Sequence, residues 1–131
     1  MLIDKIALIA LKEGKILCAK SKGKTKFYIP GGKREKGESD HETLTREIKE
    51  ELDVNLLPES LTLTGVFEAP ADGKPQGTIV KMTCYYGDYE GNPRASSEIE
   101  EIRWLSYSDI PLVSRVDTDI FEFLKNKEEL T

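Results

Sequence analysis

Residues 31–54 read GGKREKGESDHETLTREIKEELDV, and this stretch predicts the element around which the rest of the chain is arranged. Ser39 precedes Glu42 by three residues, the spacing of a capping box, so a helix is expected to begin after Ser39 and to end near Leu52. At 100° per residue, one apolar stripe runs along this helix and should face a hydrophobic core. The stripe consists of Leu44, Ile48 and Leu52.

Three acids, Glu47, Glu50 and Glu51, project over one arc beside that stripe. Like charges three and four residues apart repel, and the C-terminal half of a helix disfavours anions, at a few tenths to about 1 kcal/mol for each effect. A bound divalent cation would reverse both effects, and carboxylate oxygens are the ligands that Mg²⁺ and Mn²⁺ prefer. Considered alone, the pattern also fits a solvated face paired with Lys49 and Arg46.

The spacing of residues around the three acids is more specific than the acids themselves. Gly32 is followed after five residues by Glu38, and after seven more by Arg46-Glu47-Ile48-x-Glu50-Glu51-x-x-Val54. This order resembles the Nudix box, and chance agreement at its six fixed and two apolar positions is on the order of one in ten thousand or less. Asp53 stands where the family has glycine, and aspartate is among the few other residues that tolerate a left-handed helix end.

The resemblance extends beyond the box, to roughly residues 5–107. Residues 27–32 resemble the strand and tight loop that enter the box in this family, and residues 98–105 resemble its later acidic strand, which ends in Arg-Trp. The resemblance implies an α/β (α+β) fold, a Nudix-type α/β/α sandwich with a central mixed β-sheet.

The other elements are predicted from periodicity and turn residues. A hairpin is expected between residues 6–11 and 15–20, with its turn at Lys12-Glu13-Gly14, and a short strand at residues 27–29 that Pro30-Gly31-Gly32 ends. Further strands are expected at residues 61–68, 78–86 and 98–105, with loops at 69–77 and 90–97, and a closing helix at 117–125 that Asp117 caps.

Composition and charge limit the class of protein. A chain of 131 residues fits one domain, residues 1–131, and its formal charge of −5 argues against nucleic-acid polymers and anionic membranes as partners. The N-terminal apolar run, residues 6–11, is too short for a secretory or membrane-spanning segment. Cys18 and Cys84 lie in strand-like stretches without metal-site spacing, which predicts reduced, buried thiols in a cytoplasmic protein.

The resemblance implies roles for the residues of the box. Glu50 and Glu51 would be the inner ligands of Mg²⁺ (or Mn²⁺), with the Gly31 or Gly32 carbonyl, and Glu38 would lie just outside them. Glu47 would be a ligand or the catalytic base, held in place by Arg46. The base differs within the family, so Glu98 is a second candidate, with Glu101 behind it.

Substrate contacts are predicted on the strands that flank the box. Lys20 is a candidate phosphate ligand, because relatives often carry a basic residue where the hairpin ends. Phe27 and Tyr85 are candidates for stacking on a base, although alternation along strands places about half of such aromatic residues in the core. His41, the single histidine, is expected to cap or pack the helix instead of acting in catalysis.

These observations together predict a metal-dependent hydrolase that cleaves a phosphoanhydride bond of a nucleoside diphosphate linked to another group. The first choice of substrate is a nucleoside triphosphate, as for a MutT-like pyrophosphohydrolase, and ADP-ribose or a dinucleoside polyphosphate is the alternative. A Nudix-fold nucleotide sensor without activity, an isoprenoid diphosphate isomerase and an adaptor domain are the rival functions. The predicted partner is a small molecule, and both a monomer and a homodimer stay open.

Overall fold

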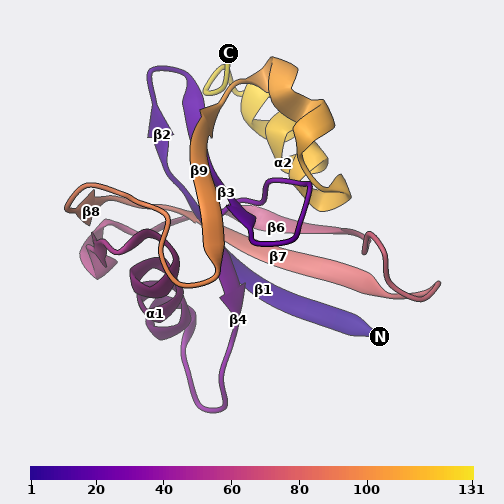
Figure 1. Ribbon diagram of the computed structural model, residues 1–131, viewed down its shortest axis with the longest axis horizontal. Helices are drawn as coiled ribbons and strands as arrows, with labels where there is room; N and C mark the ends of the chain where they lie inside the picture. Colours follow the sequence, from indigo (N-terminus) through magenta and orange to yellow (C-terminus); the bar gives the residue numbers. More distant parts are fainter.

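The computed structural model describes residues 1–131 and is built on a four-stranded sheet with the order β4-β1-β7-β6 (Figure 1). These strands are β1 (Leu2–Ile9), β4 (Gly31–Lys33), β6 (Thr62–Pro70) and β7 (Ile79–Tyr86). β1 runs parallel to β7, whereas β4 and β6 are antiparallel to their neighbours. The predicted central mixed sheet is therefore confirmed.

The remaining elements surround this sheet. A second sheet contains β2 (Leu11–Lys12), β3 (Lys15–Ser21) and β9 (Ile99–Leu105), and a small third sheet pairs β5 (Asn55–Leu56) with β8 (Tyr89–Glu90). The helices are α1 (Asp40–Leu52) and α2 (Arg115–Asn126), with the 3-10 turns η1 (Pro58–Ser60) and η2 (Tyr107–Leu112). Neither α-helix has the length and apolar character that crossing a bilayer requires.

Two hydrophobic cores lie on opposite faces of the central sheet, one beneath each helix. Side chains alternate along β1, so Ala7 and Ile9 enter the core that α2 covers, whereas Ile6 and Leu8 enter the core that α1 covers. All four are at most 1% exposed. A strand with both faces buried must lie in the interior of a sheet, and this explains the α/β/α layering visible in Figure 1.

This double burial also explains why the predicted hairpin is largely wrong. Only Leu11 and Lys12 pair with β3, while the longer strand before them pairs with β7 and β4. The turn itself is confirmed, since Glu13 and Gly14 have φ values of 52° and 76°.

The segment that enters the box also differs from the prediction. Residues 27–29 form only isolated bridges, and Gly31–Lys33, expected to end a strand, is itself strand β4 against β1. A Cβ at Gly31 would lie 2.0 Å from the Ile6 carbonyl oxygen. Gly31 and Gly32 therefore do not form the predicted turn; they allow β4 to pack closely against its neighbours.

Both helices are present, but only one begins as predicted. Ser39 caps α1 with the expected capping box, and Asp53 ends the helix with φ 54° and ψ 40° in the left-handed region. Helix α2 begins earlier than expected, after Ser114 as its N-cap, so the prediction that Asp117 caps it is wrong. Asp117 instead lies in the first turn and is fully buried. Its buried carboxylate accepts hydrogen bonds from the Ile29 N–H (3.2 Å) and the Ser114 hydroxyl (3.0 Å).

The two cysteines agree with their prediction. Cys18 and Cys84 are free and buried, and burial raises the pKa of both thiols.

Candidate active site

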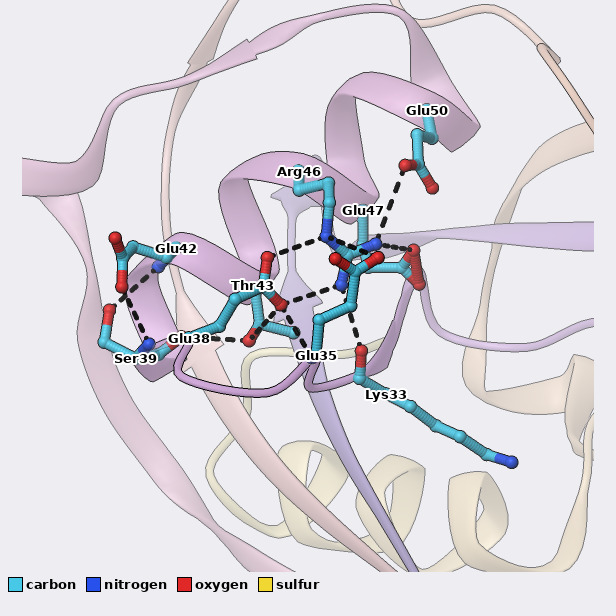
Figure 2. Close-up of polar contacts among 9 residues, drawn as sticks. All are labelled: Lys33, Glu35, Glu38, Ser39, Glu42, Thr43, Arg46, Glu47 and Glu50. Atoms are coloured by element: carbon cyan, nitrogen blue, oxygen red, sulfur yellow. Dashed lines mark hydrogen bonds and ion pairs between the residues drawn. The ribbon is translucent and has the colours of Figure 1, made fainter.

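Arg46 is the centre of the polar cluster at the acidic face of α1 (Figure 2). Its guanidinium donates two hydrogen bonds to Glu38, at 2.8 and 2.9 Å, and one to Glu47 at 3.0 Å. A further bond reaches the Lys33 carbonyl oxygen at 3.1 Å. Arg46 thus joins the end of β4, the loop that follows and the helix.

Glu38 is held entirely by protein donors. Besides the two bonds from Arg46, its carboxylate accepts the Glu35 N–H at 2.8 Å and the Thr43 hydroxyl at 3.2 Å. These donors lower the pKa of Glu38 to about 2, with the Arg46 hydrogen bonds as the largest cause. Glu38 is therefore always ionised near neutral pH, and its oxygens are occupied by the cluster.

Glu47 lies where α1 approaches β4 most closely. Its side chain is 15% exposed, and a Cβ at Gly32 would lie only 1.5 Å from its Oε2 atom. Burial is the largest cause that raises the pKa of Glu47, to about 7, and the neighbouring Glu50 carboxylate raises it further. A side chain at position 32 would therefore displace the Glu47 carboxylate.

Glu50 and Glu51, adjacent in sequence, occupy different environments. Glu51 accepts the Gly31 N–H at 3.1 Å, and burial raises its pKa to about 8. The Glu50 side chain is 51% exposed, and its nearest cation is Arg46 at 3.6 Å. Glu51 is therefore held against the glycine segment, whereas Glu50 is half exposed to solvent beside Arg46.

The chemistry of these donors fits a hard divalent cation. Mg²⁺ binds carboxylate and carbonyl oxygens, and the cluster supplies these from Glu47, Glu50, Glu51 and the adjacent glycine backbone. Burial disfavours the ionised forms of Glu47 and Glu51, and a bound cation would favour them. The structure contains no group of three Asp, Glu, His or Cys side chains close enough together to bind a metal ion as they stand. One reason is that Arg46 forms hydrogen bonds to both Glu38 and Glu47.

A cavity of about 280 Å³ opens beside this cluster. Gly31, Gly32 and Glu51 line one part of it, and the loop after β6 and the first turn of α2 line another. The residues of its wall include Lys5, Tyr28, Met82, Asp72 and Arg115. The acidic cluster and the cavity thus form one continuous site.

The structure places Lys20 and Phe27 together, outside the cavity lining. The Lys20 ammonium lies 3.8 Å from Glu101 and 5.8 Å from the centre of the Phe27 ring, and Arg103 lies 4.8 Å from the same ring centre. Phe27 is 3% exposed and belongs to the core beneath α2. Its ring offers no free face for stacking, so the structure contradicts the prediction of Phe27 as a stacking residue.

Tyr85 lies on the other side of the central sheet from the cavity. Its hydroxyl donates to Asp40 at 2.6 Å, and its ring makes an edge contact with His41, with the ring centres 5.7 Å apart. It packs against the core beneath α1. Tyr85 therefore does not line this cavity, and its contact with substrate stays a prediction. The exposed His41 lies against its ring, as expected for a residue that packs on the helix.

The second candidate for the base, Glu98, has an exposed side chain just before β9. Its neighbour Ile99 lines the cavity, but Glu98 itself does not. The Glu98 backbone carbonyl accepts the Lys22 N–H at 2.9 Å. Its role stays a prediction.

Three residues of the site were not predicted from the sequence. Lys5 and Tyr28 line the cavity, and buried Asp117 holds Ile29 two residues before Gly31. A signal for Lys5 existed, because a lysine interrupts the alternation of a strand that is otherwise apolar on that face. Tyr28 was missed because a shift of one residue moves a side chain to the other face.

Comparisons with known proteins bear on the family and the fold. The NUDIX domain model matches residues 4–126. An ADP-ribose pyrophosphatase from Methanocaldococcus jannaschii is 33% identical over 103 residues, which is 76% of this chain. The chain spans 59% of the length of that relative.

Solved structures show the same fold at lower identity. A MutT NUDIX hydrolase from Burkholderia pseudomallei matches with a TM-score of 0.79 and 23% identity, covering 95% of this chain and 98% of its own. A MutT protein from Methanosarcina mazei Go1 matches with a TM-score of 0.76 and 22% identity, covering 97% and 95%. The family model, matched over nearly the whole chain, shows that this protein belongs to the Nudix family.

Proposed function

We propose that this protein is a metal-dependent hydrolase that cleaves the phosphoanhydride bond of a nucleoside diphosphate linked to another group. The observation that carries the proposal is the continuity between the acidic face of α1 and the cavity, through Glu51 and Gly31. The acids would bind the charged diphosphate through a cation, and the cavity would receive the attached nucleoside.

The residues have distinct parts in this reaction. Glu50 and Glu51, with Glu47 and the Gly32 carbonyl, would hold Mg²⁺ or Mn²⁺, and Glu38 would keep Arg46 in place. When bound, the cation neutralises phosphate charge and lowers the pKa of a coordinated water. Glu47, Glu50 and Arg46 are proposed as catalytic residues, because both carboxylates lie beside the Arg46 guanidinium and next to the expected cation.

Glu47 is the first candidate for the general base. A base works best when its pKa lies near the working pH, and burial raises the pKa of Glu47 to about 7. The bond from Arg46 fixes the direction of its carboxylate. Glu98 is the second candidate, since it lies exposed beside a residue of the cavity wall.

ADP-ribose is the first substrate to test, because the relative at 33% identity is named ADP-ribose pyrophosphatase. A cavity of about 280 Å³ lies just below the range for ligand pockets, roughly 300–1,000 Å³, and suits one nucleoside. This size suits a nucleoside triphosphate equally, so the MutT-like activity that the sequence favoured is the second candidate. The two substrates share the bond that is cleaved.

The remaining properties follow from charge and cysteine chemistry. A net charge of −5 supports a small-molecule partner bound through a cation, and not a nucleic-acid polymer or an anionic membrane. Two free, buried thiols support a reducing compartment such as the cytoplasm.

The test is hydrolysis by the purified protein of ADP-ribose, NADH, the nucleoside triphosphates and diadenosine polyphosphates, in Mg²⁺, Mn²⁺ or EDTA. Glu51→Gln should lower kcat/KM at least about 100-fold, since it removes a cation ligand. Glu59→Gln, an equal change at an exposed acid of η1, should leave kcat/KM unchanged. If no compound is cleaved and nucleotides still bind tightly, the protein is a nucleotide sensor.

A further inference from the structure

Lys5 lies in the wall of the cavity, on a face of β1 that is otherwise apolar. Residues two and four positions along the same face, Ala7 and Ile9, belong to the core beneath α2. Its register partner on β7, Met82, lines the cavity with it. Because β1 is an interior strand, a lysine here is unusual, since the side chain must leave its charge in a partly buried place.

The ammonium of Lys5 has no direct salt bridge, although its charge lowers the pKa of the buried carboxyls of Glu51 and Asp117. It forms no ion pair within 4.0 Å and donates no hydrogen bond, and its one aromatic contact is the Tyr28 ring, whose centre lies 5.6 Å away. Arg34 and Arg46, near the same sheet, are both paired with acids. No salt bridge or hydrogen bond within the protein therefore occupies the Lys5 ammonium, and it can donate to a ligand.

A second lysine adds to the positive charge at this point. Lys33 on β4 lies directly opposite Lys5 in antiparallel register, and it also has no acidic partner within ion-pair distance. Figure 2 shows its side chain extending away from Arg46 and the acids. Like charges directly opposite in a sheet are destabilising, and a bound anion would relieve the repulsion.

The position of Lys5 relative to the acidic cluster indicates which anion it meets. Lys5 lines the same cavity as Gly31, Gly32 and Glu51 of the acidic cluster and as the first turn of α2, so an anion bound there lies within reach of both. Other cations of the cavity wall, Lys24, Lys74 and Arg115, are exposed on loops or at a helix end, whereas Lys5 is half-buried on a strand. Its placement is therefore the most rigid of the four.

We propose that Lys5 binds the phosphoryl group that stays on the nucleoside in the cavity, beside the ring of Tyr28. This role rests on the proposed function, because it takes the acidic cluster as the place of the scissile link. It makes Lys5 a substrate-binding residue that selects nucleotides over nucleosides.

Three variants separate charge from structure. Lys5→Met removes the charge and keeps much of the apolar stem, and its melting temperature should be unchanged or higher, because the repulsion from Lys33 disappears. Lys5→Arg keeps the charge. Lys81→Met is the matched control, since Lys81 lies between two cavity residues of β7 and so points to the opposite face of the sheet.

The experiment is equilibrium binding of AMP and UMP, and of adenosine and uridine, to each variant by calorimetry in EDTA. Lys5→Met should weaken binding of both monophosphates roughly 10- to 100-fold and change binding of the nucleosides less than about threefold. Lys5→Arg should retain most of the affinity, and Lys81→Met all of it. Inorganic phosphate serves as the probe for the anion alone.

The outcomes distinguish this inference from the proposed function. Equal monophosphate affinity in Lys5→Met and the unchanged protein overturns the inference, as does an equal loss for nucleosides, which would show an effect of cavity shape. Monophosphate binding that depends on Lys5, without hydrolysis of any compound, supports the inference and overturns the proposed function. An unchanged protein that binds neither monophosphate overturns the inference alone, because the proposed function is tested by hydrolysis in Mg²⁺ or Mn²⁺.

Discussion

At the scale of single residues, Arg46 decides which acids of the box are available to a cation. It occupies both oxygens of Glu38, whose pKa is lowered to about 2, and one oxygen of Glu47. Glu51, which Arg46 does not reach, is raised to a pKa of about 8 by burial. Arg46 therefore neutralises Glu38 and contacts Glu47, whereas Glu51 is left without a salt bridge to it.

Arg46→Lys should lower kcat/KM by roughly 10- to 100-fold, as is typical when a residue that orients metal ligands is changed. A single ammonium cannot replace the planar group that binds Glu38 twice while also reaching Glu47. Its melting temperature should fall by several degrees, since Glu38 loses donors. Lys49→Ala, which removes one exposed ion pair of the same helix, should change neither quantity measurably, and equal losses in both variants would contradict this account.

The aromatic residues show how far residue-scale prediction reaches. Phe27 and Tyr28 are adjacent, and the sequence favoured the first as the substrate contact. The structure buries Phe27 beneath α2 and turns Tyr28 into the cavity. The sequence therefore predicted that an aromatic residue of this segment faces the site, but it selected the wrong one of the two. Which of them faces the cavity depends on how the segment packs against α2.

At the scale of elements, the approach of β4 to β1 and α1 controls the site. Gly31 faces the backbone of β1, where a Cβ would lie 2.0 Å from the Ile6 carbonyl oxygen. Gly32 faces α1, where a Cβ would overlap the Glu47 carboxylate, the far end of a flexible side chain. Gly31 is therefore needed for strand packing, whereas Gly32 leaves room for the Glu47 carboxylate.

Gly31→Ala and Gly32→Ala should have separable effects. Gly31→Ala forces the strands apart and should lower the free energy of unfolding by roughly 2 kcal/mol or more, measured by urea denaturation. Gly32→Ala should stay folded, with a smaller loss of stability, but lose hydrolysis because Glu47 must move. Loss of hydrolysis in Gly32→Ala with Glu47 shown unmoved by crystallography would refute the steric explanation.

The helices show where local sequence suffices. Ser39, Glu42 and Asp53 set both ends of α1 through hydrogen bonds within a few residues, and these were predicted. Asp117 was misassigned as a cap because its partner, the Ile29 N–H, lies 88 residues away. A buried acid that binds a distant backbone group has the same local sequence as a helix cap.

At the scale of the whole molecule, buried acids make the stability depend on pH. The pKa of Glu51 is raised from 4.5 to about 8, that of Glu47 from 4.5 to about 7, and that of Asp117 from 3.8 to about 7. The folded state therefore binds these protons more tightly than the unfolded state. Stability is highest below the unfolded values and is lost as pH rises through the folded ones.

In EDTA, the free energy of unfolding should fall by on the order of a few kcal/mol between pH 5.5 and 8.5, measured by thermal and urea denaturation. Mg²⁺ should reduce this fall, because a cation favours the ionised forms of Glu47 and Glu51. Glu51→Gln should flatten the profile in EDTA and abolish the effect of Mg²⁺ at pH 8.5. Asp117→Asn should flatten it without altering the effect of Mg²⁺, and a loss of that effect would contradict separate roles.

The family, the acids of the box and the limits of α1 can be predicted from the amino-acid sequence, because they depend on spacing along one helix and on interactions between near neighbours. The strand that pairs with β1, the direction of Asp117 and the choice among Lys5, Phe27 and Tyr28 as cavity residues are visible in the folded structure alone. Those outcomes depend on contacts between segments far apart in the chain. A shift of one residue in the pairing of a strand moves each of its side chains to the other face of the sheet. The periodicity within one segment does not show which register the strand adopts.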